Sequence, residues 1–270
     1  MSIKTAKPST VLQPYIKQYW GIENVLPDGE KHIQRIIPSG LPELSLYIGS
    51  RPQILGNKKD FEDNFILNGH QKEFYDLQIE KELRVFSIVF QPQGLMAFFN
   101  FPLNEVYNQS VPLKYLNKVL EEKILPQFAG EISFEKRVQI IEKYFYTMLQ
   151  EEHNRFNFSR INHAINIISK ARGKTSIENL ASETCLSRKQ FERKFSELIG
   201  ITPKQYLKTI RLQYSLFLKS RKRKLNITDL AYEVGYYDQA HFINDFKSQT
   251  GFTPKQYFDN NSAYSDFFES

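Results

Sequence analysis

Short apolar segments separated by Pro, Gly and Asn occupy the first 112 residues, and this pattern predicts β-strands joined by turns. Four segments fit best, at residues 35–38, 43–49, 65–69 and 83–90. The last one alternates at first and then becomes continuously apolar, as in a half-buried strand that ends in a core. Several short strands at this spacing favour a sandwich or a small barrel.

Helical periodicity replaces this pattern in the middle of the chain. Helices are predicted at 92–99, at 113–120 and from Ser133 to about Glu152. In the third helix a stripe of apolar residues recurs at helical spacing: Val138, Ile141, Phe145, Met148 and Leu149. The stripe is expected to pack either on the β domain or on a second subunit. The polar stretch 150–157 predicts a domain linker.

An internal repeat dominates the helical region from residue 158 to about 258. The sequence IENLA at 177–181 recurs as ITDLA at 227–231, and GITPKQY at 200–206 recurs as GFTPKQY at 251–257. Phe191 and Phe195 of the first copy correspond to Phe242 and Phe246 of the second. The offset grows from 50 to 51 residues between the blocks, so one residue is inserted near the turn of the second copy.

Each copy is typical of two helices joined by a tight turn. Gly235 supplies the backbone freedom that a sharp turn needs in the second copy. The predicted N-caps are Ser176 and Ser187 in the first copy, and Asn226 or Thr228 and Asp238 in the second. A helix from Pro203 to about Leu218, about 24 Å long, joins the copies. It can hold two recognition helices about one DNA turn apart.

The second helix of each copy is amphipathic. Phe191 and Phe195 face inward, and the opposite face holds Lys189, Gln190, Arg193 and Ser196; in the second copy that face holds Ala240, His241, Asn244, Lys247 and Ser248. Arg and Lys bind guanine, and Asn and Gln bind adenine. An ordinary solvated helix face is the alternative, but two such faces in tandem favour DNA.

Charge follows the same division of the chain. Residues 155–258 carry 19 Lys and Arg against 8 Asp and Glu, a balance of +11, whereas residues 1–154 have a balance of −2 and 259–270 one of −3. A confined basic excess is typical of a protein that binds a polyanion. The run KSRKRK at 219–224 is predicted to be a loop near phosphates, with a solvated loop as the alternative.

The segment 230–257 resembles the signature of the AraC/XylS family of bacterial transcription regulators along its whole length, and Arg211, Leu212 and Leu216 resemble that family's linker helix. The resemblance implies two helix-turn-helix units in adjacent major grooves. By position it puts Lys189, Glu192 and Arg193 near bases, with Gln239, Ala240, His241 and Asn244 in the second unit. The predicted DNA-binding set also includes Arg188, Gln190 and Lys247. Arg is common in the family where Asn244 stands, which leaves the base preference of the second unit open.

The segments 36–43 and 90–95 resemble, less specifically, the cupin-like sensor domains of many family members. The predicted fold class is therefore α+β multidomain. A β-barrel or jelly-roll-like sensor domain with flanking helices (1–152), which binds a small effector or mediates dimerisation, precedes an all-α DNA-binding domain (158–258). An acidic tail, 259–270, follows.

Catalytic and metal chemistry find little support in the residues. His32 and His70 stand alone without a His-x-His pair, so we expect no metal, no cofactor and no enzymatic activity. Cys185, in the first turn, is expected to be a small buried apolar residue. No apolar run suits a membrane span or a secretory signal, which predicts a cytoplasmic protein.

The leading hypothesis is a regulator that binds double-stranded promoter DNA under the control of a small-molecule effector, and contacts RNA polymerase if it is an activator. One alternative is a DNA-binding protein whose N-terminal half only forms a homodimer. Another is a cupin-like enzyme fused to a DNA reader. No membrane partner is expected.

Overall fold

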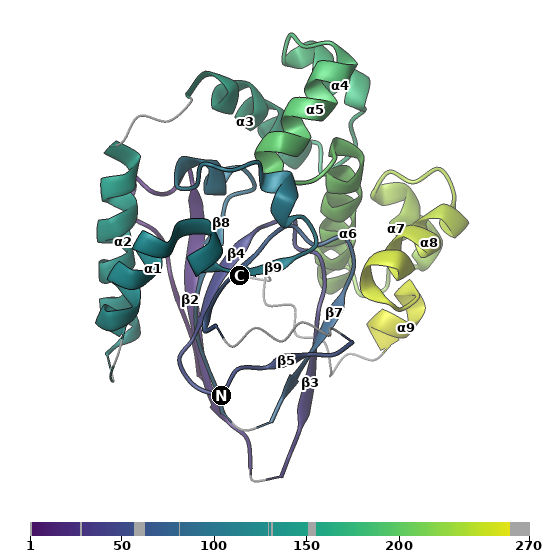
Figure 1. Cartoon of the computed structure of the whole chain (residues 1–270). Coiled ribbons are helices and arrows are strands. Elements are labelled where there is room, and N and C mark those ends of the chain that lie inside the picture. The colour runs from purple at the N-terminus through teal and green to yellow at the C-terminus, as the bar shows by residue number, and fades with distance from the viewer. Residues whose placement is uncertain are drawn as a thin grey trace.

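The computed structural model describes residues 2–27, 29–56, 63–80, 82–128, 130, 132–150 and 155–259, and it contains a sheet-rich N-terminal half and a helical C-terminal half (Figure 1). A six-stranded antiparallel sheet has the order β1-β2-β8-β4-β6-β9, and a three-stranded sheet has the order β3-β7-β5. The strands are β1 Ser2–Ala6, β2 Ile16–Val25, β3 His32–Ile36, β4 Glu43–Tyr47, β5 Gln53–Ile54, β6 Phe65–Asn68, β7 Tyr75–Ile79, β8 Glu82–Phe90 and β9 Ser110–Pro112.

The predicted fold class is confirmed, although the strands form two sheets and not a single closed barrel. The four predicted strands correspond to β3, β4, β6 and β8. The ten-residue strand β2 was missed because Gln18, Glu23 and Asn24 interrupt its apolar pattern. Pairing with β8 from Ile16 to Val25 stabilises β2 in the sheet. Because β8 is distant in the chain, the local sequence pattern does not indicate this pairing.

Helices α1 Leu113–Phe128 and α2 Phe134–Gln150 cover one face of the larger sheet (Figure 1). Ile141 and Phe145 of α2 are fully buried, and the Phe145 ring lies 4.3 Å from that of Phe98. Val138, Met148 and Leu149 pack against the same core. Of the two roles predicted for the α2 stripe, packing within the chain is therefore the one found.

The short helices between β8 and α1 differ from prediction. Residues 92–99 form only a 3-10 turn, η1 Gly94–Ala97, and a second such turn is η2 Leu103–Val106. Helix α1 extends beyond the predicted end at 120, with a non-helical residue at Asn117, whose φ is −155°.

Seven helices of the described chain follow residue 154: α3 Arg155–Lys170, α4 Ile177–Glu183, α5 Arg188–Ile199, α6 Pro203–Arg221, α7 Ile227–Glu233, α8 Gln239–Thr250 and α9 Pro254–Asp259. Two predictions need correction here. The predicted linker 150–157 begins at Gln150, which ends α2, and its last three residues, 155–157, are also helical, whereas 151–154 lie outside the described residues. Residues 219–221 of the basic run end α6 instead of forming a loop. The tail is described only to Asp259.

Helix α6 contributes to the cores of both helix-turn-helix units. Tyr206 and Leu207, in its first turns, pack with Phe191 and Phe195 of α5. Further along, Leu212 and Leu216 pack with the core of α7 and α8. Because the two clusters lie along one helix, the orientation of each unit depends on α6. None of the helices in the described ranges has the length and apolarity to cross a membrane.

Direct contacts join the two halves of the chain. The Arg35 guanidinium of β3 is paired with Asp76 of β7 at 2.7 Å and also donates to the Thr250 carbonyl at the end of α8. It lies 4.0 Å from the Phe74 ring centroid and 4.4 Å from that of Phe252. The first unit meets the N-terminal half elsewhere, where α5 packs against η2.

Candidate DNA-binding surface

Side-chain caps fix both helices of the first unit. Ser176 accepts a hydrogen bond from the Asn179 backbone N–H, which starts α4. Ser187 and Gln190 form a capping box at the start of α5. Gly200 ends α5 in the left-handed region, with φ of 87°. The sequence-predicted caps Ser176 and Ser187 are confirmed.

The second unit uses different cap residues at the same places. Asn226 starts α7 by accepting from the Asp229 N–H at 2.8 Å, so it and not Thr228 is the cap. Asp238 accepts from the His241 N–H at 2.7 Å and starts α8. Its carboxylate also lies at the positive end of the helix dipole.

The turn of the first unit departs from prediction at Cys185. This residue is exposed, not buried, and it has a φ of 53°. Gly235 stands at the equivalent place in the second unit with φ of 87°. Glycine adopts this left-handed backbone without strain, whereas cysteine does not.

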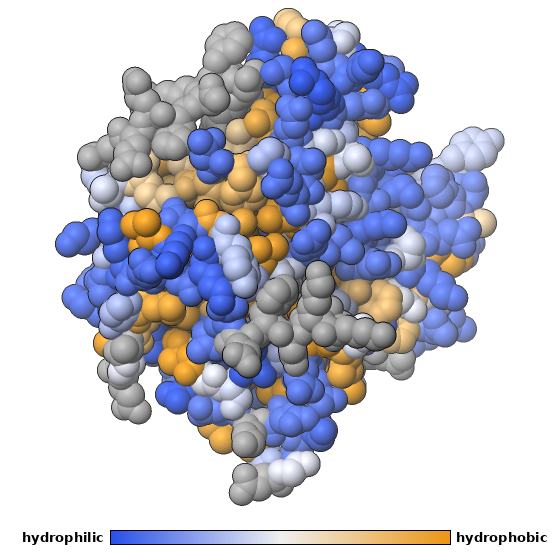
Figure 2. Space-filling view, in the orientation of Figure 1, coloured by the Kyte–Doolittle hydropathy of each residue, from blue (hydrophilic) through white to orange (hydrophobic). Residues whose placement is uncertain are grey.

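All ten predicted DNA-binding residues lie on the two recognition helices α5 and α8. Nine of them are exposed, and Glu192 is half-buried. From α5 come Arg188, Lys189, Gln190, Glu192 and Arg193, and from α8 come Gln239, Ala240, His241, Asn244 and Lys247. Hydrophilic residues cover α4 and α5 and the region of α7 and α8 on the face shown in Figure 2. The structure therefore presents the predicted set on two helices, while contact with bases remains a prediction.

Several of these side chains already have partners. Arg188 contacts Glu178 at 2.6 Å and Glu192 at 3.1 Å, and these carboxylates raise the pKa of its guanidinium. Arg193 lies 3.5 Å from Glu197. These side chains are between 40% and 63% exposed, so their ion pairs are weak and can be exchanged for phosphate or base contacts.

Two of the predicted amide side chains also have structural roles. The Gln190 carboxamide oxygen accepts from the Ser187 N–H within the capping box. The Gln239 oxygen accepts from the Thr228 hydroxyl at 2.8 Å. Binding a base through these oxygens requires breaking those bonds.

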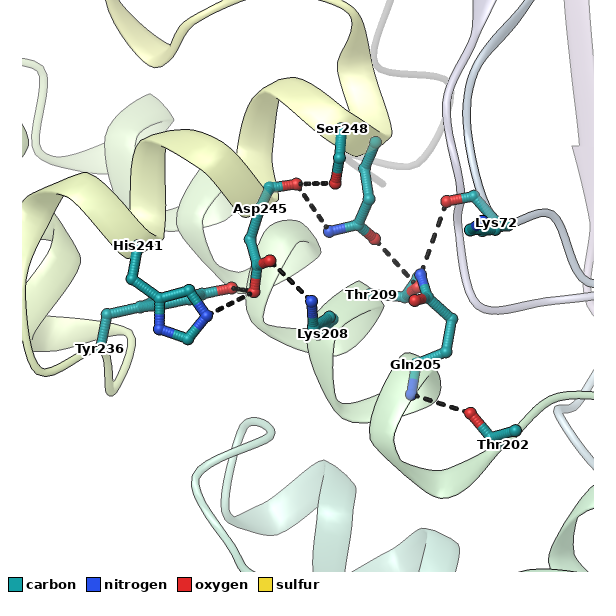
Figure 3. Close-up of polar contacts among 10 residues, drawn as sticks. Lys72, Thr202, Gln205, Lys208, Thr209, Tyr236, His241, Asp245 and Ser248 are labelled. Carbon is teal, nitrogen blue, oxygen red and sulfur yellow. Dashed lines mark hydrogen bonds and ion pairs between the residues drawn. The ribbon is translucent and has the colours of Figure 1, made fainter.

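Sequence reasoning missed Asp245, a carboxylate on the buried face of the recognition helix α8 (Figure 3). Its Oδ1 lies 2.7 Å from Lys208 Nζ of α6. Its Oδ2 accepts from the Tyr236 hydroxyl at 3.2 Å and lies 3.5 Å from His241 Nε2. An acidic residue between Phe242 and Phe246 of the buried stripe was the available signal, because a buried charge needs partners.

The described residues contain no group of three or more His, Cys, Asp or Glu that could hold a metal ion. His32 is exposed. His70 is buried between the two halves, edge-on to Tyr206 with ring centroids 6.0 Å apart. Burial lowers the pKa of His70 to about 4.

Two family models match the chain. Residues 180–260 match a model described as "Helix-turn-helix domain", and residues 4–112 match a "Domain of unknown function (DUF6597)". An uncharacterized HTH-type transcriptional regulator of Haemophilus influenzae is 36% identical over 99 residues, which cover 36% of this chain and 33% of that protein. The HTH-type transcriptional regulator AlkR of Acinetobacter baylyi is 35% identical over 82 residues, covering 30% and 26%.

The matched stretches thus span about a third or less of these two relatives. Among solved structures, ToxT from Vibrio cholerae covers 89% of this chain and 97% of its own, with a TM-score of 0.46 and 14% identity.

Two capped helix pairs, each with a tight turn and an exposed second helix, define a tandem helix-turn-helix domain. The helix-turn-helix model matches residues 180–260, and the named relatives are HTH-type transcriptional regulators. The C-terminal part of this chain is therefore a helix-turn-helix domain that is similar to those of HTH-type transcriptional regulators, in line with the resemblance to the AraC/XylS family.

Proposed function

We propose that the protein is a sequence-specific DNA-binding transcription regulator that binds promoter DNA through α5 and α8 in adjacent major grooves. The observation that carries this proposal is the pair of exposed recognition helices on a common helix α6, within a segment of charge balance +11. Phosphate attraction supplies affinity, and side chains at the base edges supply specificity. Such a regulator works in the cytoplasm, where bacterial promoter DNA is found.

The proposal divides the chain into an N-terminal sensor, 1–152, and a DNA-binding domain, 158–258. A cleft of about 660 Å³ lies between the two halves and supports control by a small molecule. Gln93 from one side donates to Asn162 of α3 at 2.9 Å, and Gln213 of α6 donates to the Pro38 carbonyl at 2.7 Å. A ligand that fills this cleft would change how the halves pack.

A selection of fragmented host genomic DNA with the full chain, at about 0.15 M salt, tests the proposal, because non-specific binding is weak there. We expect a few promoter fragments that share a bipartite site. Enrichment that appears only after adding cell extract would add an effector to the proposal. No enriched sequence under either condition would overturn it.

A further inference from the structure

The side chain of His241 contacts a polar cluster formed by Asp245, Tyr236 and Lys208, which the helix-turn-helix pattern does not require (Figure 3). The ring is about half exposed near the start of α8, whereas the Asp245 side chain one turn later is 9% exposed. The Tyr236 ring packs edge-on against the imidazole, with centroids 5.2 Å apart. Together these contacts restrict how the ring can turn.

The two carboxylate oxygens of Asp245 have different partners. Lys208 reaches Oδ1, and the Tyr236 hydroxyl and His241 Nε2 face Oδ2. Burial and the Asp245 charge raise the pKa of Tyr236, so its hydroxyl remains a donor. A carboxylate can only accept hydrogen bonds. A neutral imidazole facing Oδ2 therefore carries its proton on Nε2.

This proton placement determines what the other ring nitrogen can do. In a neutral imidazole one nitrogen is a donor and the other an acceptor. Nδ1 lies on the side of the ring away from Asp245 (Figure 3). It is therefore an acceptor on a ring that is about half exposed.

We propose that Asp245 is a positioning residue that sets the His241 tautomer, so that the second recognition helix selects a base with a major-groove amino group, adenine or cytosine, at one position. Adenine N6 and cytosine N4 donate in the major groove, whereas guanine O6 and N7 and thymine O4 accept. An acceptor at Nδ1 can accept a hydrogen bond from the amino group of adenine or cytosine. Against guanine O6 and N7 or thymine O4 it is left without a donor. This inference rests on the proposed function.

The variant Asp245→Asn is expected to reverse the base preference of His241. The Lys208 ammonium holds the amide oxygen in the place of Oδ1, so the NH₂ group occupies the place of Oδ2. His241 Nε2 then accepts from that NH₂ group, and the proton moves to Nδ1. The recognition helix would present a donor, and guanine or thymine would become the preferred base.

The experiment selects DNA with the full chain at pH 8, where an ordinary imidazole is neutral, from a bipartite site whose second half is randomised. The position of the DNA site at which His241→Ala loses its base preference is the one that His241 contacts. There we expect the wild type to favour adenine or cytosine about three- to tenfold, the size of one net hydrogen bond. Asp245→Asn should shift the preference to guanine or thymine. Glu105→Gln, an exposed charge loss in the N-terminal half, is the matched control and should leave it unchanged.

Nitrogen NMR of the wild-type imidazoles at pH 8 is a second measurement, which does not depend on DNA or on the folding of a variant. We expect His241 with its proton on Nε2. A proton on Nδ1, a preference for guanine or thymine in the wild type, or an Asp245→Asn profile equal to the wild type would each overturn the inference. A wild type that enriches no sequence overturns the proposed function, whereas enrichment that His241→Ala leaves unaltered overturns this inference alone.

Discussion

In the first helix-turn-helix unit the turn holds Cys185, and in the second unit the equivalent residue is Gly235. The recognition helices differ as well, because Lys194 stands where the second helix has the buried Asp245. The backbone plan is thus repeated, while the groups that contact the exposed side chains of the recognition helices are not. The two copies of one fold therefore present chemically different surfaces.

The units also meet the N-terminal half through different chemistry. In the first, Tyr206 packs on Phe195 and on the buried His70. In the second, the equivalent Tyr257 packs on Phe246, and the contact to the N-terminal half is made by Arg35 instead. One unit is docked through a neutral imidazole and aromatic rings, and the other through a cation.

The largest expected effects are on the equivalent core residues Phe195 and Phe246. Both are essentially fully buried, so Phe195→Ala and Phe246→Ala should each lower the free energy of unfolding by about 3–5 kcal/mol in guanidinium titrations. Phe217→Ala, at a ring that is 44% exposed, is the control and should cost much less. A loss below about 1 kcal/mol in either unit would contradict the core assignment for that unit.

Acid should act on the first unit through His70. Its pKa is about 4 in the folded chain against an ordinary value of 6.5, so only the unfolded chain binds a proton between these values. The stabilisation is complete above about pH 6.5 and is lost as the pH falls toward 4, by about 1–3 kcal/mol.

Denaturation at several pH values, compared between wild type and His70→Gln, checks this prediction. The difference in unfolding free energy should change across that window. The exposed His32→Gln is the control, for which the curves should stay parallel. Parallel curves for His70→Gln would show that its protonation does not weaken the fold.

Arg193 and Asn244 occupy equivalent places on the two recognition helices. If Arg193 reads a base, Arg193→Ala should cost about 1–3 kcal/mol on the selected site and relax specificity at one position of the first half-site. Asn244→Ala should act on the second half-site only. Binding measured on single-base variants of the site distinguishes these results. An equal loss on all sequences would instead identify Arg193 as a phosphate contact.

The smallest effect concerns the turn. Cys185→Gly removes a side chain from a left-handed backbone and should raise the unfolding free energy by about 0.5–1 kcal/mol. Gly235→Ala should lower it, because the new Cβ would stand in left-handed backbone, 2.7 Å from the Lys174 side chain. Chemical denaturation of both variants checks this pair. A destabilised Cys185→Gly would mean that the thiol makes a contact worth more than the strain.

The sequence predicted the helical half well, since the helix caps and the apolar stripe are local signals that repeat in both units. Ser187, Asp238 and the paired phenylalanines were found for that reason. It predicted the sheets less well, because β2 depends on partners distant in the chain. Asp245 and the Arg35 contact were missed for the same reason, since each needs groups from other elements.

Glycines close both recognition helices, and each is crowded by the N-terminal half. A Cβ on Gly200 would stand 2.7 Å from the Leu103 carbonyl oxygen, and one on Gly251 would stand 2.6 Å from Arg35. Both recognition helices are therefore held at their carboxyl ends by the N-terminal half. A rotation of that half relative to α6 would move these two ends, and with them the spacing between the exposed residues of α5 and α8.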